Sequence, residues 1–179
     1  ADWQARRGLW LRLGIKSEEG RAGGLAYQID GDKHAYASKN KTQTSVFDPV
    51  VCELAYRWWG QPGGVVLDPF AGGSVRGAVA SLLGFKYWGC ELRVEQVQAN
   101  RDQWMTNPAL HGGPYRPKWN QGDSAKVMVG PGVPPADLLF SCPPYGNLEV
   151  YSDEPGDISQ LAYPDFLGPY GAIIKAACD

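Results

Sequence analysis

The spacing of hydrophobic residues predicts a chain that alternates between strands and helices. Apolar residues recur every three or four positions from Phe47 to Trp59 and stop before a run of Gly and Pro, which predicts an amphipathic helix. Further on, short apolar runs typical of buried strands alternate with helical patterns, and a last helix is interrupted or kinked around Gly168 and Pro169. Strands are predicted at 65–67, 87–92, 118–121 and 138–141, and helices at 74–83, 94–105 and 163–178.

These repeated strand–helix units predict an α/β fold with a doubly wound parallel sheet and helices on both faces. Residues 46–179 are expected to form one domain, preceded by a Trp- and Arg-rich segment and a polar loop at 1–45. After Ser141 the pattern predicts only helix, whereas a doubly wound sheet normally continues with further strands. We therefore expect a sheet truncated at its C-terminal side, so that the chain is a fragment or is completed by a partner.

Composition is that of an ordinary soluble protein. The chain has 179 residues, 44% hydrophobic and 20% charged, enough for a buried core. Its formal net charge is −2, so a nucleic-acid partner would need a local basic surface. Four widely spaced cysteines without a CxxC pair, and only two histidines, predict no zinc site and a reducing, cytoplasmic setting. With no charged-then-apolar leader and no apolar run of membrane-spanning length, we expect neither export nor a membrane.

A glycine-rich turn follows the first predicted strand and opens the next helix. The strand ends at Asp68, and Gly72 and Gly73 allow a ligand to approach the backbone closely. Ser74 is suited to cap the helix. Glu91 ends the second strand 23 residues after Asp68, a spacing typical of an acidic side chain that accepts hydrogen bonds from ribose hydroxyls. These features predict a nucleotide-like cofactor, and a tight turn with a solvated Glu91 is the alternative.

Two further loops follow later strands. Asp123 is placed to accept a hydrogen bond from a bound adenine, or else forms a simple Asx turn. The last predicted strand leads into Cys142, Pro143, Pro144 and Tyr145. Prolines hold such a loop rigid with its carbonyls pointing outward, and the tyrosine ring offers a surface for a flat substrate.

Both motifs resemble those of one enzyme family. Asp68–Gly73 is similar to the DPF-x-G cofactor motif of S-adenosylmethionine-dependent DNA amino-methyltransferases, and Cys142–Tyr145 to their (D/N/S)-P-P-(Y/F) catalytic motif. Ser45–Pro49 resembles the segment that contacts the methionine end of the cofactor, and the flanking sequence is similar to bacteriophage-encoded DNA methylases. The resemblance covers the chain from about residue 45 onward. It implies a Rossmann-like class I methyltransferase fold, S-adenosylmethionine as cofactor, and restriction–modification-type methylation of adenine N6 or cytosine N4 in a host cytoplasm.

The resemblance also implies a set of site residues and no metal. Cofactor-binding positions are Phe47, Asp68, Pro69, Phe70, Ala71, Gly72, Gly73, Ser74, Glu91, Leu92, Asp123 and Ser124. Catalytic positions are Cys142, Pro143, Pro144 and Tyr145. In the family's mechanism the target base leaves double-stranded DNA and stacks on the aromatic ring, here Tyr145. Its amine donates hydrogen bonds to the first motif side chain and to the next carbonyl, here that of Pro143.

Two positions depart from the family pattern. Cys142 stands where the family has Asp, Asn or Ser, and a thiol is a poor acceptor. Ser141 would replace it only if the loop shifted by one residue, and Ser74 stands where the family has a further Gly. A covalent role for Cys142 is disfavoured, because the nucleophile of cytosine-carbon methyltransferases follows a proline. The simplest alternative role for this residue is to pack as a small buried side chain at the strand end.

Other classes of function stay open. A dinucleotide-dependent oxidoreductase would use the same glycine loop but leaves Cys142–Tyr145 unexplained. A cofactor-binding but inactive or split domain agrees with Cys142 and with the missing strands. RNA and protein-glutamine methyltransferases also use NPPY-like loops, so the DNA substrate depends on the resemblance.

The basic side chains have alternative roles as well. A first group would contact DNA, or would form the solvated face of a helix whose tryptophans pack inward. It comprises Arg6, Arg7, Arg12, Lys16 and Arg21, with Trp3 and Trp10 between them. Arg76 and Arg93 follow strand ends and would either touch the ligands or stabilise helix starts and neighbouring carboxylates.

Overall fold

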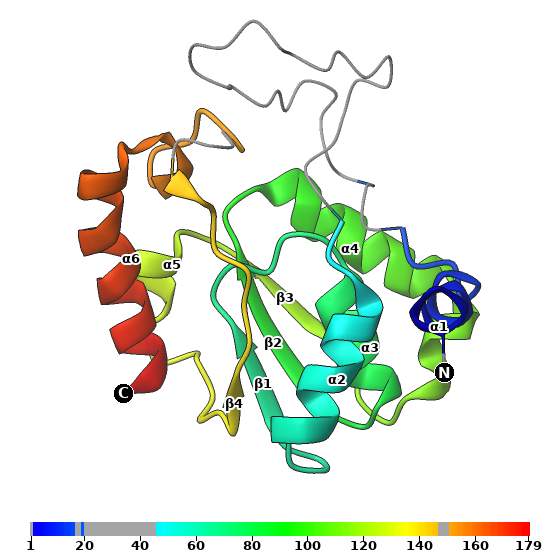
Figure 1. Ribbon diagram of the computed structural model, residues 1–179. Helices are drawn as coiled ribbons and strands as arrows, with labels where there is room; N and C mark the ends of the chain where they lie inside the picture. Colours follow the sequence, from blue (N-terminus) through cyan, green and yellow to red (C-terminus); the bar gives the residue numbers. More distant parts are fainter. Residues whose placement is uncertain (1, 17–18, 20–45, 147–150) are drawn as a thin grey trace, which may run out of the picture.

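The computed structural model describes residues 2–16, 19, 46–146 and 151–179 (Figure 1). At its centre lies a parallel sheet of four strands in the order β3-β2-β1-β4. The strands are β1 (Val65–Asp68), β2 (Lys86–Glu91), β3 (Lys118–Gln121) and β4 (Leu138–Leu139). The chain runs outward from β1 through β2 to β3 and then returns to the other side of β1. The strand order therefore reverses between β1 and β4, which is where ligands bind in open α/β sheets.

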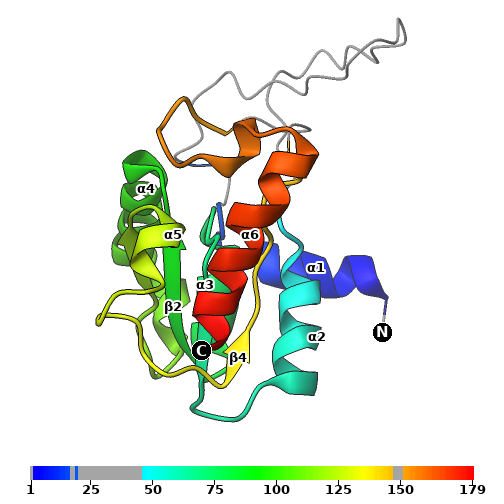
Figure 2. The same ribbon diagram turned by 90° about the vertical axis from the view of Figure 1, so that its left-hand side faces the viewer.

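Helices cover both faces of the sheet, as the sequence predicts (Figures 1 and 2). One face carries α1 (Trp3–Leu11), α2 (Pro49–Trp59), α3 (Val75–Leu82) and α4 (Val94–Thr106). The other carries the short α5 (Ser124–Val127) and the long α6 (Tyr163–Cys178). Two 3₁₀ turns, η1 (Pro108–Gly112) and η3 (Ile158–Gln160), complete the elements used below.

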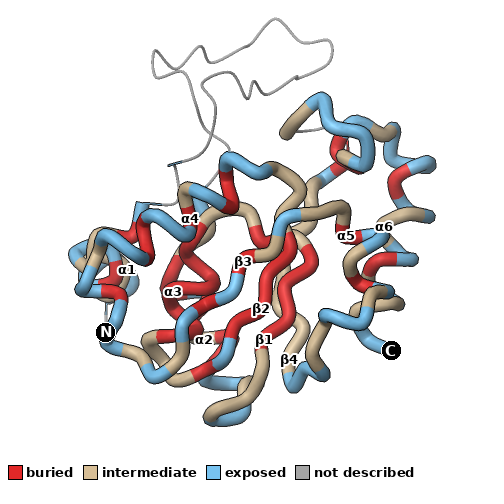
Figure 3. The backbone as a smooth tube through the Cα atoms, turned by 180° about the vertical axis from the view of Figure 1, so that it is seen from behind, coloured by how far each residue is buried: buried red, intermediate tan, exposed pale blue. Residues whose placement is uncertain are grey.

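Alternating strand residues supply the two halves of the core. Val66 and Tyr87 point to the cluster under α2, α3 and α4, whereas Leu67 and Cys90 belong to the cluster under α5 and α6. The buried stretches of β1 and β2 form the centre of the molecule (Figure 3). A sheet buried on both faces explains why these strands read as continuous apolar runs.

Element boundaries differ from the prediction where side chains set them. Helix α2 begins two residues later than predicted, because Asp48 caps it by accepting a hydrogen bond from Val50 N (2.8 Å). Helix α6 is not interrupted: it continues through Pro169 to Cys178. The expected cap at Ser74 is wrong. Ser74 stands at the N-cap position of α3, but its hydroxyl makes no cap bond.

The N-terminal helix α1 packs on α2 through a buried carboxylate. Glu53 accepts hydrogen bonds from Arg6 Nε (2.7 Å) and from Trp10 Nε1 (2.7 Å). Trp10 is buried in the main core cluster, so this tryptophan packs inward, whereas Arg21 lies outside the described residues. Among the described helices, none combines the length and the apolar character needed to span a membrane.

Candidate active site

A cavity of about 160 Å³ opens at the carboxyl ends of the strands, beside the point where the strand order reverses. Its walls come from the loop after β1, the ends of β2 and β3, the loop after β4, and the segment before α6. Among the predicted site residues, those lining it are Phe47, Pro69, Phe70, Gly72, Gly73, Glu91, Leu92, Asp123, Ser124, Cys142, Pro144 and Tyr145. The two sequence motifs therefore face one shared space.

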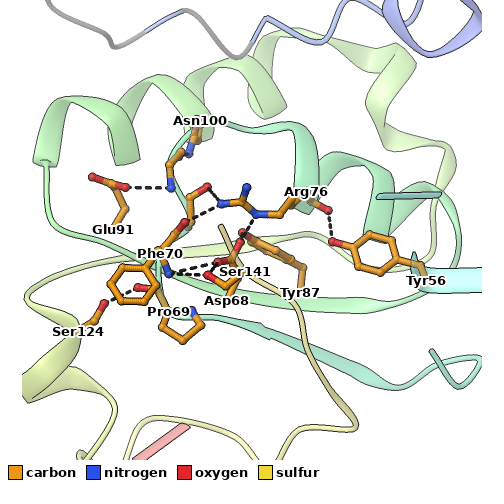
Figure 4. Close-up of polar contacts among 12 residues, drawn as sticks. Tyr56, Asp68, Pro69, Phe70, Arg76, Tyr87, Glu91, Asn100, Ser124 and Ser141 are labelled. Atoms are coloured by element: carbon orange, nitrogen blue, oxygen red, sulfur yellow. Dashed lines mark hydrogen bonds and ion pairs between the residues drawn. The ribbon is translucent and has the colours of Figure 1, made fainter. Parts of the chain in front are cut away.

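Asp68 lies beneath the cavity rather than in its wall. It is fully buried, and both carboxylate oxygens are engaged (Figure 4). Oδ2 accepts hydrogen bonds from Arg76 Nε (2.6 Å) and Tyr87 OH (2.6 Å). Oδ1 accepts from Ser141 Oγ (2.5 Å) and from Phe70 N (3.2 Å). The carboxylate thus holds the surrounding loops in place.

Arg76 supports the loop after β1 from below. Its guanidinium forms a buried ion pair with Asp68 and also donates to the carbonyls of Phe70 (2.6 Å) and Ala71 (2.9 Å). Burial disfavours the charged guanidinium, but its neighbours, Asp68 foremost, together outweigh this, so the pKa of Arg76 is raised. The guanidinium also lies over the Phe47 ring, 4.8 Å from its centroid. Arg76 therefore stabilises a neighbouring carboxylate, and since Arg76 and Arg93 both line the cavity, a contact with a ligand stays open for both arginines.

Glu91 lies at the end of β2, across from the glycine turn. Its Oε2 accepts a hydrogen bond from Gly72 N (2.9 Å), and its Oε1 accepts from Arg93 N (2.9 Å). Burial raises the pKa of Glu91. Gly72 adopts a φ of +49°, a conformation that favours glycine, and its carbonyl accepts from Asn100 Nδ2 (2.7 Å). Each Glu91 oxygen keeps a lone pair for a ligand hydroxyl.

Asp123 and Ser124 form the wall at the end of β3. Asp123 caps α5 by accepting from Ala125 N (3.0 Å), which is the Asx-type turn considered from the sequence, and it pairs with Lys126 (3.2 Å). Ser124 Oγ donates to the carbonyl of Pro69. This bond ties the loop after β3 to the loop after β1.

The loop after β4 forms the opposite wall. Tyr145 is 55% exposed at the cavity mouth, with its hydroxyl 3.6 Å from Cys142 Sγ. The alternative role for Cys142, that of a small buried residue at the strand end, is not observed, because Cys142 is only partly buried and lines the cavity. Ser141 turns the other way, toward Asp68. Cys142 is therefore the first side chain of the Cys142–Tyr145 motif that faces the cavity.

Some predicted residues lie outside the cavity wall, and some contributors were not predicted. Asp68, Ala71, Ser74 and Pro143 do not line the cavity, and Ser45 lies outside the described residues. Sequence spacing does not indicate that Tyr87, Asn100 and Ser141 support the loops, nor that Ile158 and Ile173 line the cavity. Tyr151, which follows the catalytic motif and is expected from its position to shape the pocket, does line it. Arg76, the one charged residue in the otherwise uncharged helix 75–82, was indicated by the sequence, and it both pairs with Asp68 and lines the cavity.

Comparison with known proteins supports the fold assignment. The chain has the Rossmann-like fold of methyltransferases. It is similar in structure to TrmN from Thermus thermophilus, a tRNA methyltransferase, with a TM-score of 0.53 and 20% sequence identity. The match covers 73% of this chain and 34% of TrmN, so the chain spans about a third of that protein's length. No protein-family model and no curated protein matches the sequence.

Proposed function

We propose that the chain transfers a methyl group from S-adenosylmethionine to an exocyclic amino group of a DNA base, adenine N6 or cytosine N4. The observation that carries this proposal is that the glycine turn with Glu91 and the loop with Cys142 and Tyr145 line the same cavity. The methyltransferase fold supports methyl transfer in general. The similarity of both motifs to DNA amino-methyltransferases supports an amino group on a base.

The residues around the cavity fit the proposed cofactor. Glu91 offers carboxylate oxygens with free lone pairs, which suits ribose hydroxyls, and Phe70 offers an apolar ring nearby. Asp123 keeps acceptor capacity beyond its cap bond and would face the adenine. When bound, S-adenosylmethionine would supply a methyl group carried on a positively charged sulfur.

The loop after β4 would hold the nucleophile. Tyr145, at the mouth, offers a face for stacking a flipped base, and such stacking is worth about 1–3 kcal/mol per base. The resemblance assigns the hydrogen bond that orients the amine to the carbonyl of Pro143, although Pro143 does not itself line the cavity. The rigid prolines would keep this geometry and exclude water, so that positioning supplies most of the acceleration. Cys142 would contribute a weak acceptor at most.

The departure at Cys142 favours a second candidate, a domain that binds the cofactor but does not transfer its methyl group. Ser141 does not compensate, because its hydroxyl is directed to Asp68. A Cys142→Asp variant separates the two candidates. If the wild type methylates DNA, the first holds. If only the variant does, the natural chain is a degenerate enzyme.

Titration calorimetry with S-adenosylhomocysteine tests cofactor binding. We expect micromolar binding by the wild type and at least tenfold weaker binding, about 1.4 kcal/mol, by Glu91→Ala. Glu95→Ala is the matched control, because Glu95 is an exposed glutamate on α4 that does not line the cavity. Absence of binding by a well-folded wild type, or equal losses in both variants, would contradict the proposal.

The substrate is tested separately with a radiolabelled methyl donor. We expect label in double-stranded DNA and none in tRNA or in a protein extract. Label in tRNA alone would assign the chain the substrate class of TrmN instead. Chromatography of the digested product would then distinguish N6-methyladenine from N4-methylcytosine.

A further inference from the structure

The two loops of the site are joined by one hydroxyl group. Ser141 follows β4 and directly precedes Cys142, yet its Oγ donates to Asp68 Oδ1 (2.5 Å) at the end of β1. The same oxygen accepts a hydrogen bond from Phe70 N (3.2 Å), in the loop after β1 (Figure 4). A single side chain therefore bridges the loop 69–73 and the loop 142–145.

Ser141 does not itself line the cavity. A change of its hydroxyl can therefore affect a ligand only through the residues that it holds. On one side these are Phe70, which lines the cavity, and the buried Asp68. On the other side it fixes the backbone from which Cys142 projects.

Asp68, which accepts the hydrogen bond from the Ser141 hydroxyl, is itself held in place by other donors. Besides Ser141, the Asp68 carboxylate accepts from Arg76 Nε, Tyr87 OH and Phe70 N, at 2.6, 2.6 and 3.2 Å. Asp68, Arg76 and Tyr87 are all buried, and of the three Arg76 alone lines the cavity, so little water reaches the carboxylate. A hydrogen bond to a buried carboxylate is stronger and more directional than one to a neutral group in water. Asp68 and its hydrogen-bond donors therefore hold the loops 69–73 and 142–145 in fixed positions relative to the sheet.

We propose that Ser141 is a positioning residue that couples the cofactor loop 69–73 to the catalytic loop 142–145. Its hydroxyl keeps Phe70 and Cys142 at a set separation across the cavity. Loss of the hydroxyl frees the loop after β4 from Asp68, so both loops gain freedom although the sheet remains intact. The expected effect on ligand affinity depends on the proposed function, whereas the coupling of the loops does not.

The first test compares Ser141→Ala with Ser81→Ala. Ser81 is a matched control, because its hydroxyl likewise bonds a segment distant in sequence, at the Tyr115 carbonyl beside η1, and it does not line the cavity. Titration with S-adenosylhomocysteine is expected to give at least fivefold weaker binding for Ser141→Ala and wild-type binding for Ser81→Ala. Ser141→Thr, which keeps the hydroxyl, is expected to bind within twofold of the wild type. Wild-type affinity in a less stable Ser141→Ala would show a merely structural role and overturn the proposal.

The second test needs no ligand. Hydrogen exchange is followed in the wild type, Ser141→Ala and Ser81→Ala, in peptides that cover residues 69–74 and 139–146. Pro143 and Pro144 carry no amide hydrogen, so the second peptide includes Phe140, whose N donates to the Leu67 carbonyl (3.0 Å). We expect both peptides to exchange at least tenfold faster in Ser141→Ala, and neither to change in Ser81→Ala. Unchanged exchange in either loop would refute the coupling. If the wild type binds no S-adenosylhomocysteine, the proposed function fails, and this exchange measurement alone decides the role of Ser141.

Discussion

Acidification is expected to weaken the attachment of α1 to α2 through a single carboxylate. The side chain of Glu53 is 7% exposed and accepts hydrogen bonds from Arg6 Nε (2.7 Å), Trp10 Nε1 (2.7 Å) and Arg57 Nε (2.9 Å). These donors, Arg6 foremost, lower the pKa of Glu53 from 4.5 to about 2, although burial acts in the opposite direction.

The sign of the pH effect follows from this lowered pKa. Between about pH 4.5 and pH 2 the unfolded chain binds a proton at Glu53 that the folded chain does not. The stabilisation is therefore complete above pH 4.5 and is lost as the pH falls through 2. A pKa difference of about 2.5 corresponds to about 3 kcal/mol, a large part of the stability of a small domain.

Urea unfolding of the wild type and Glu53→Gln between pH 2 and pH 6 measures this contribution. Glutamine cannot ionise. Subtracting the unfolding free energy of Glu53→Gln from that of the wild type at each pH therefore removes the titration of all other groups. We expect the stability difference to shrink by about 3 kcal/mol between pH 4.5 and pH 2. A difference that stays constant over this range would refute the assigned pKa and the role of the three donors.

Three shorter predictions concern the core and the site. Gly77→Ala would place a Cβ 2.7 Å from a ring carbon of Trp119, so urea unfolding should show a loss of about 1–3 kcal/mol, and unchanged stability would contradict this packing. Arg76→Met leaves a buried carboxylate without its ion-pair partner, so the same assay should show a loss of about 3–5 kcal/mol, and a loss below 1 kcal/mol would contradict it. Burial raises the pKa of the Cys90 thiol to about 11, so iodoacetamide at pH 8 should modify the partly buried Cys142 and the exposed Cys178 before Cys90, and peptide mass spectrometry that finds Cys90 modified first would contradict this.

Much of the fold could be predicted, because local patterns determine it. Strand β3 has the predicted bounds, and β1 and β2 lie within one residue of theirs. Apolar runs flanked by glycine, and helical spacing of apolar residues, depend on neighbours close in sequence. The parallel sheet follows from the repeated strand–helix units, because each helix returns the chain to the same end of the sheet.

The choice of side-chain partners could not be predicted. Ser74 is well placed to cap α3, but its hydroxyl donates to Gln103 Oε1 (2.7 Å) on α4 instead. Asp68 has the sequence position of a ligand-binding group, but donors from α3, from β2 and from Ser141 after β4 surround it. The hydrogen-bond partner of a side chain depends on which groups, distant in sequence, are buried together. Sequence spacing carries no information on that.

The distance in sequence between the two halves of the cavity affects how the chain folds. β1 pairs with β2 about 21 positions later, as Val65 with Lys86, whereas its other neighbour lies 72 positions away, as Val66 with Leu138. Closing the longer loop costs more chain entropy and delays the pairing. The glycine turn and Glu91 should therefore assemble first, and β4 should add Cys142 and Tyr145 last. Under the proposed function, the half of the cavity that would hold the cofactor is therefore expected to form before the half that would hold the base.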